Sequence, residues 1–252
     1  MNKPVHTQIF AHRGANKEAA ENTRAAFDCS LSYAIDGIET DVQLSRDEVT
    51  VLWHDRFLLK LGHPTKHIDD FDFSELQEMN FAEHFSRSAK PEVIVKLDAF
   101  LQAYRQRTNL LLEIKNREWE ARARHEIKIN QTLAMVGKVK DDSIMISSFN
   151  LDSLIYAQQR SPGFPLVYNF EEEQTFKDAQ QVLSAHPFLH GLCLPIAALD
   201  VAMVKLLRGA AKSIAVYTCN NDEEINKALE LGVNILISDL PHKALMIRDR
   251  AR

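Results

Sequence analysis

The sequence predicts an α/β fold of the closed (β/α)8 type, a TIM barrel in which eight parallel strands alternate with helices. Eight short apolar runs recur along the 252 residues, and nearly every run is followed by a stretch with helical periodicity. Such alternation is typical of βα units and of a parallel sheet. The length is close to the roughly 250 residues of a typical barrel, and eight strands fit a closed barrel better than an open sheet.

The predicted barrel strands are short and apolar. In chain order they are Ile9–Ala11, Gly37–Leu44, Leu110–Ile114, Ile144–Ile146, Leu166–Val167, Leu192–Leu194, Ile214–Tyr217 and Ile235–Ile237. The predicted helices are Thr23–Ala34, about Ala99–Gln106, Trp119–Val136, Leu151–Gln159, Glu172–Ala185, Val201–Ala211, Asp222–Leu231 and His242–Arg250. Thr23 is expected to act as an N-cap. The acidic run 171–173 is interpreted as a helix start, where the helix dipole favours negative charge.

One departure from this alternation follows the second strand. Val49–Trp53 comes after only four turn residues, Ser45–Glu48, whereas a parallel crossover needs about a dozen. We therefore expect Val49–Trp53 to return antiparallel against the extended end of the second strand. A turn centred near residue 46 would place His54 about opposite Glu39.

The second departure is the stretch from residue 55 to about 97. It is too long for a simple barrel connection and is rich in His and Asp. We interpret it as a small insertion after the second strand, at the barrel mouth. The whole chain, 1–252, is then one barrel domain that carries this insertion.

Composition limits the possible classes of protein. A formal net charge of −5 argues against nucleic-acid binding or binding to an anionic membrane, since both favour a basic face. The cysteines Cys29, Cys193 and Cys219 lack CxxC spacing, which indicates reduced thiols. No signal-peptide pattern, membrane anchor or apolar stretch of about 18 residues is apparent. The expected location is the cytoplasm. The helix faces are not distinctive enough to predict an oligomeric state.

Polar residues gather at the C-terminal ends of the first strands, where the active sites of such barrels lie. They are His12 and Arg13 after the first strand, Glu39 and Asp41 on the second, His54 on the hairpin, and Glu113 and Lys115 on the third. Residues two apart on a strand point to the same face, so each carboxylate-bearing strand directs two polar groups to one side.

These residue types together indicate phosphodiester cleavage. Carboxylates are hard oxygen ligands that suit Mg²⁺ or Ca²⁺ rather than Zn²⁺. Arginine and lysine suit phosphate oxygens, and histidines have the near-neutral pKa that general acid–base catalysis requires. Each feature alone has an ordinary explanation; Lys115, for example, could simply pair with Glu113. Their coincidence at the strand ends favours a site.

Eight motifs extend this set over residues 8 to 241. They are Ala11–Gly14, Glu21–Phe27, Gly37–Leu44, Trp53–Asp55, Leu112–Lys115, Ile146–Phe149, Tyr217–Asn220 and Ile237–Pro241. In order and spacing they resemble the signature of the glycerophosphodiester phosphodiesterase family, bacterial cytoplasmic type. The resemblance implies a TIM barrel and hydrolysis of small-molecule glycerophosphodiesters to sn-glycerol 3-phosphate and an alcohol.

The resemblance also implies roles for individual residues. His12 and His54 match the family's catalytic pair. The implied metal ligands are Glu39, Asp41 and Glu113, which would bind one divalent cation, Mg²⁺ being favoured over Ca²⁺. The implied substrate-binding residues are Arg13 and Lys115 at the phosphate, with Phe149 and Tyr217 near the glycerol. Neither the order of the acid and base roles nor the nucleophile, water or the glycerol's own 2-hydroxyl, follows from the sequence.

Two departures from the family pattern bear on the alcohol preference. Tyr217 stands where the family usually has tryptophan, and Arg56–Lys60 replaces an Arg-Thr-Thr-like segment. A lysophospholipase D or another phosphodiesterase on the same site stays open. So do a glycosidase that uses Glu39 and Glu113 as its carboxylate pair, and a non-catalytic phosphate-binding barrel.

Overall fold

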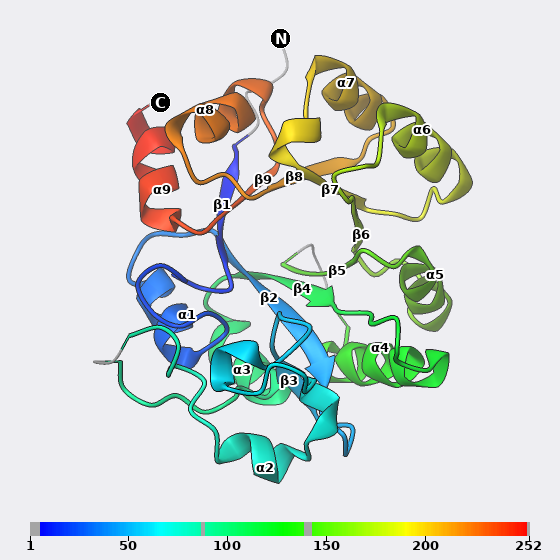
Figure 1. Cartoon of the computed structure of the whole chain (residues 1–252). Helices are drawn as coiled ribbons and strands as arrows, with labels where there is room; N and C mark the ends of the chain where they lie inside the picture. The colour runs from blue at the N-terminus through cyan, green and yellow to red at the C-terminus, as the bar shows by residue number, and fades with distance from the viewer. Residues whose placement is uncertain (1–5, 87–88, 139–142, 251–252) are drawn as a thin grey trace.

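The predicted barrel is confirmed by the computed structural model, which describes residues 6–86, 89–138 and 143–250. Eight parallel strands close into a ring because β1 pairs with both β2 and β9. They are β1 (Gln8–His12), β2 (Gly37–Leu44), β4 (Asn109–Ile114), β5 (Ile144–Ser148), β6 (Leu166–Asn169), β7 (Gly191–Pro195), β8 (Ser213–Tyr217) and β9 (Ile235–Ser238). Figure 1 shows the helices arranged around this ring.

The helices that surround the barrel lie close to the predicted ranges. They are α1 (Arg24–Leu31), α3 (Leu97–Tyr104), α4 (Arg122–Val136), α5 (Leu151–Arg160), α6 (Phe176–Ala185), α7 (Val201–Gly209), α8 (Asp222–Leu231) and α9 (Pro241–Arg250). In the described ranges, none of them combines the length and the apolar character needed to cross a membrane.

The start of α6 was predicted wrongly. The helix begins at Phe176, so the acidic run 171–173 precedes it. Thr175 is the N-cap: the Asp178 backbone N–H donates to its hydroxyl, and its own N–H donates to the Asp178 carboxylate at 2.7 Å. This reciprocal cap satisfies two backbone donors, a stronger determinant than the attraction of negative charge to the helix dipole. The predicted cap at Thr23 is confirmed, since it accepts a hydrogen bond from Ala26 N.

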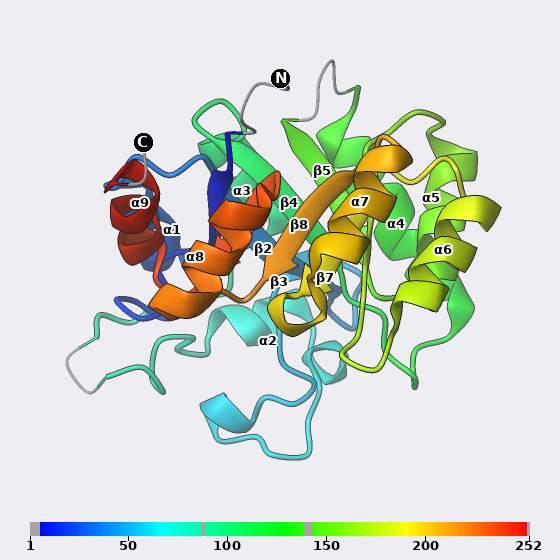
Figure 2. The ribbon, with the colours of Figure 1, turned by 90° about the horizontal axis from the view of Figure 1, so that it is seen from above.

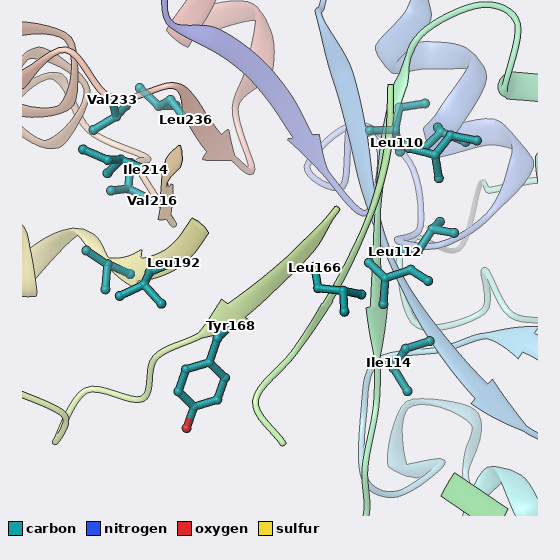
Figure 3. Close-up of a cluster of buried hydrophobic side chains, with 14 of the residues drawn as sticks. Leu110, Leu112, Ile114, Leu166, Tyr168, Leu192, Ile214, Val216, Val233 and Leu236 are labelled. Carbon is teal, nitrogen blue, oxygen red and sulfur yellow. The ribbon is translucent and has the colours of Figure 1, made fainter. Parts of the chain in front are cut away.

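Side chains alternate between the two faces of the barrel wall. Those that point outward form the main hydrophobic core between the strands and the helices. Figure 3 shows part of this core, including Leu110, Leu112 and Ile114 along β4, with Leu166 and Tyr168 on β6. The two-residue period of a strand therefore assigns the intervening residues to the barrel interior.

The interior of the barrel contains a separate apolar cluster. It consists of Phe10, Leu111, Met145, Val167, Cys193, Ala215, Ile235 and Ile237. Gly37 is required beside it, because a Cβ atom at that position would lie 2.4 Å from the ring of Phe10. With this space filled by apolar groups, the inward residues nearer the C-terminal strand ends form a distinct polar layer.

The hairpin on the second strand is confirmed. Strand β3 (Thr50–Leu52) lies outside the ring and runs antiparallel to β2, with Leu52 opposite Val42. The register differs by one residue from the expected one: continued along the strands it places His54 opposite Thr40 instead of Glu39. Trp53 N still donates to Asp41 O at 3.1 Å, so the hairpin brings His54 to the polar end of β2.

The insertion connects β3 to α3. It contains two short 3-10 helices, η1 (Leu59–Leu61) and η2 (Ile68–Asp70), and the helix α2 (Phe73–Gln77). It has a hydrophobic cluster of its own, which includes Trp53 and Phe81. Figure 2 shows this cyan segment at one end of the barrel. The assignment of all 252 residues to one domain stays a prediction.

Candidate active site

A cavity of about 230 Å³ lies at the C-terminal ends of the barrel strands. Eight of the nine predicted site residues line it: His12, Arg13, Glu39, His54, Glu113, Lys115, Phe149 and Tyr217. The ninth, Asp41, is fully buried beside them. The alternation of the strands and the return of the hairpin thus bring all nine residues to one place.

Three buried carboxylates form the centre of this site. Glu39 and Asp41 point inward from β2, and Asp41 is the register partner of Glu113 on β4. One oxygen atom of each lies within 4.8 Å of the others, a grouping that could hold a metal ion. Among the described residues, Glu39 Oε2 accepts no hydrogen bond, while Asp41 Oδ1 and Glu113 Oε1 contact the ammonium of Lys115. A buried carboxylate oxygen without a donor, with two further carboxylate oxygens beside it, suits a hard, oxygen-binding cation, so the residues fit a divalent metal.

Two positively charged side chains balance the charge of these carboxylates. Lys115 Nζ lies 3.0 Å from Asp41 Oδ1 and 2.5 Å from Glu113 Oε1, and Arg13 Nε lies 3.2 Å from Asp41 Oδ2. Burial alone would raise the pKa of Asp41, but Lys115 and Arg13 hold this pKa well below its usual range. Glu39 is less compensated: burial and its two acidic neighbours raise its pKa well above the usual value. The pKa values of Glu39 and Asp41 are therefore shifted in opposite directions.

Both predicted catalytic histidines are held by an aspartate. His12 Nδ1 lies 2.6 Å from Asp239 Oδ1, and His54 Nδ1 lies 2.9 Å from Asp55 Oδ1. A carboxylate at Nδ1 keeps the proton on that nitrogen, which leaves Nε2 to accept or donate a proton elsewhere. His12 Nε2 is 3.8 Å from Glu39 Oε2, so it faces the carboxylate group. Burial and the charge of Arg13 lower the pKa of His12.

The turn after β1 orients Arg13. Its backbone has φ of 58°, and Gly14 follows with φ of 82°. A Cβ atom at Gly14 would lie 2.6 Å from the backbone of Ala26, so both the left-handed conformation and the close approach require glycine. Asn22, also at positive φ, donates to Asp41 Oδ2 at 2.9 Å. The Glu-Asn-Thr motif therefore serves the site as well as the helix cap.

A lysine from the insertion forms ion pairs with two carboxylates next to the site. Lys60 Nζ lies 2.9 Å from both Glu21 Oε1 and Asp55 Oδ2. Glu21 in turn lies 3.2 Å from Arg13 Nη1, while Asp55 holds His54. A second group of possible metal ligands, made of Glu21, His54 and Asp55, is thus already supplied with a cation by Lys60. Segment 56–60, which departs from the family pattern, is thus linked through Lys60 to both Arg13, a predicted phosphate-binding residue, and His54, a predicted acid–base residue.

One wall of the cavity is aromatic. The rings of Phe149 and Tyr217 meet edge to face with centroids 6.0 Å apart. The Tyr217 hydroxyl donates to the carbonyl of Phe170 at 2.5 Å, so this side chain offers its ring to the cavity. A second hollow, of about 670 Å³, adjoins the cavity and shares His54, Glu113, Lys115 and Phe149 with it. It continues over polar residues such as Asn116 and Asn150.

Several residues of the site were not predicted. Asp55 and Asp239 lie within quoted motifs, and their positions next to a histidine and after a strand could have indicated their role. Ser147 and Asn169 line the cavity, and two-residue alternation along β5 and β6 could have found them. No signal in the sequence places Lys60, because its position depends on how the insertion folds.

Comparisons with known proteins agree with this geometry. The family model described as "Glycerophosphoryl diester phosphodiesterase family" matches residues 12–243. A glycerophosphodiester phosphodiesterase of Bacillus altitudinis is 26% identical over 98% of this chain and 100% of its own length. A structure from Silicibacter pomeroyi has the same fold, with a TM-score of 0.87 at 20% identity, over 99% of this chain and 95% of that one.

One solved structure carries a ligand that bears on the chemistry. A phosphodiesterase from Oleispira antarctica was determined in complex with the product sn-glycerol-3-phosphate. It is 25% identical to this chain, with a TM-score of 0.86 and coverage of 97% of both chains. Since the family model spans most of the sequence and these proteins align over nearly all of it, the chain belongs to the glycerophosphoryl diester phosphodiesterase family and is an enzyme of that family.

Proposed function

We propose that the enzyme hydrolyses glycerophosphodiesters to sn-glycerol 3-phosphate and an alcohol, with the help of one divalent cation. The observation that supports this most directly is what one small cavity and its wall contain: two aspartate-held histidines, one arginine and one lysine side chain, and a group of three buried carboxylates. The product bound to the Oleispira antarctica relative supports the same reaction.

Arg13 and Lys115 bind the phosphate in this proposal. Both cations contact Asp41, which fixes them on the same side of the cavity. The Arg13 guanidinium and the Lys115 ammonium donate to phosphate oxygens and offset their charge. Glu21 holds the remaining side of the guanidinium and so orients it.

Glu39, Asp41 and Glu113 would hold the cation, with Mg²⁺ favoured over Ca²⁺ because of the hard oxygen ligands. When bound, the cation supplies electrostatic stabilisation of the negative charge on the phosphoryl oxygens.

His12 and His54 move the protons. Because Asp239 and Asp55 keep a proton on each Nδ1, the Nε2 atom of one histidine accepts a proton from the nucleophile. The other histidine, in its protonated form, donates a proton to the oxygen of the departing alcohol as the P–O bond breaks. Water is the nucleophile in a direct route; in a cyclic route the glycerol 2-hydroxyl attacks first and water then opens the ring. Both routes use the same two nitrogens.

The departing alcohol occupies the adjoining hollow of about 670 Å³. Its polar lining suits a hydrophilic alcohol better than an acyl chain, which favours small glycerophosphodiesters over lysophospholipids. We also propose that the enzyme works in the cytoplasm, since Cys29, Cys193 and Cys219 are all free thiols.

The test is release of sn-glycerol 3-phosphate from glycerophosphocholine and glycerophosphoethanolamine, before and after EDTA, with Mg²⁺ or Ca²⁺ added back. Release that EDTA abolishes and one of these ions restores is the expected result. Release only from lysophospholipids would support the lysophospholipase D alternative. Activity that survives EDTA would remove the metal from the proposal, and no release from any phosphodiester would refute it.

A further inference from the structure

Two unassigned polar side chains face the cavity from the strands across the barrel from β1. Ser147 on β5 and Asn169 on β6 both line it, and they are 1% and 4% exposed. Asn169 Nδ2 donates a long hydrogen bond of 3.4 Å to Ser147 Oγ, while Asn169 Oδ1 accepts none from the part of the chain that the structure describes. Asn169 therefore lines the cavity and carries a buried amide oxygen that has no donor among the described residues.

Such an oxygen selects the kind of ligand group that can face it. A buried polar atom without a partner is costly, so a ligand that supplies a donor gains affinity. Phosphate and carboxylate oxygens carry no proton to donate, whereas a hydroxyl both donates and accepts. One hydroxyl can donate to Asn169 Oδ1, and another can pair with Ser147 Oγ. This side of the cavity suits a group with neighbouring hydroxyls.

The aromatic wall limits the shape of that group. Phe149 and Tyr217 present ring edges and faces to the cavity, and the Tyr217 hydroxyl is engaged with Phe170. A ligand between this wall and Asn169 needs C–H groups on one side and hydroxyls on the other. The volume of about 230 Å³ is below the roughly 300–1,000 Å³ of sites for drug-sized ligands, so the group is small.

We propose that Asn169 and Ser147 determine substrate specificity by binding the free hydroxyls of the glycerol group. The inference rests on the proposed function, in which Arg13 and Lys115 hold the phosphate. When Arg13 and Lys115 hold the phosphate, the carbon chain of the glycerol group extends across the cavity towards β5 and β6. The enzyme then selects the diol of the retained product, independently of the departing alcohol.

The experiment compares kcat/KM for glycerophosphoethanolamine and for its analogue in which propane-1,2-diol replaces glycerol. This analogue lacks the terminal hydroxyl but keeps the secondary hydroxyl that a cyclic route requires. The variants are Asn169→Leu, which keeps the size of the side chain, and Ser147→Ala. The matched control is Cys193→Ala: Cys193 is the register partner of Asn169 and lines the same cavity. Thermal unfolding checks that each variant folds.

The wild-type enzyme is expected to prefer the glycerol substrate, and this preference should fall about tenfold in Asn169→Leu and measurably in Ser147→Ala. Cys193→Ala should change both substrates equally. An unchanged preference in both folded variants would overturn the inference, and if Asn169→Leu does not fold, Ser147→Ala decides. If the wild type hydrolyses neither substrate, the proposed function fails. Calorimetric affinities of both variants for sn-glycerol 3-phosphate and propane-1,2-diol phosphate then decide on Asn169 and Ser147 separately.

Discussion

Replacing Glu39 by glutamine should stabilise the metal-free protein and abolish its stabilisation by metal. Glu39 has oxygen neighbours on Asp41 and Glu113 within 4.8 Å, and its pKa is raised by burial and by these two carboxylates. A carboxyl whose pKa is raised by folding destabilises the fold at every pH above its unfolded-state pKa. The amide removes that charge at neutral pH while it keeps the shape of the side chain.

The size of the effect follows from the spacing. Two unit charges 4.8 Å apart repel by about 3.5 kcal/mol at an effective dielectric constant of about 20. Arg13 and Lys115 offset part of the repulsion from the two neighbours, so we expect a net gain of about 2 kcal/mol for Glu39→Gln. For a chain of this size, about 2–4 °C per kcal/mol gives a rise in Tm of about 4–8 °C.

The assay is thermal unfolding in EDTA and in Mg²⁺. A cation present at 100 times its Kd stabilises the wild type by about 2.7 kcal/mol, and this shift should vanish in the variant. The matched control is Glu230→Gln on the exposed face of α8, which should change stability by less than about 0.5 kcal/mol. A lower Tm for Glu39→Gln in EDTA would falsify the argument from charge repulsion. A Mg²⁺ shift as large as that of the wild type would exclude Glu39 as a ligand.

Three further predictions concern positions around the site. Asp239→Asn should lower kcat about 10- to 100-fold, because His12 loses the carboxylate that orients it, and should also lower Tm, because the same carboxylate accepts from Asn16 and Asn220; steady-state kinetics would show no loss of kcat if His12 were not a catalytic residue. Lys60→Met should lower kcat/KM about tenfold, and Lys60→Arg should restore most of it. The same kcat/KM in the Met variant as in the Arg variant would mean that the insertion does not position His54. Glu120→Gln should destabilise the fold by about 3 kcal/mol in urea unfolding, because it leaves the buried Lys128 ammonium unpaired, and adding Lys128→Met should recover most of the loss; additive effects of the two changes would contradict this. Burial alone would raise the pKa of Glu120, but His125 and Lys128 lower it to about 2, so the stability that the ionised carboxyl contributes above pH 4.5 should be lost as the pH falls towards 2.

Much of the fold followed from local patterns. The apolar runs predicted every barrel strand, since a buried strand needs apolar residues and its ends need turn residues. The short connection 45–48 predicted the hairpin because four residues cannot cross over a sheet. The spacing of Glu39 and Asp41 placed both carboxylates on one face, because a strand repeats every two residues. The predicted start of α6 was wrong, because the N-cap at Thr175 and not the acidic run 171–173 sets where the helix begins.

The strands, their inward residues and the end of the barrel that carries the site could all be predicted from local sequence patterns. Which side chains meet there could not, and became known from the folded structure. Asp239 reaches His12 because the last strand closes against the first, and Lys60 reaches Glu21 because a separately packed insertion lies at the barrel mouth. The physical reason is that periodicity and turn length depend on neighbours along the chain. Contacts between distant segments depend on barrel closure and on how whole elements pack.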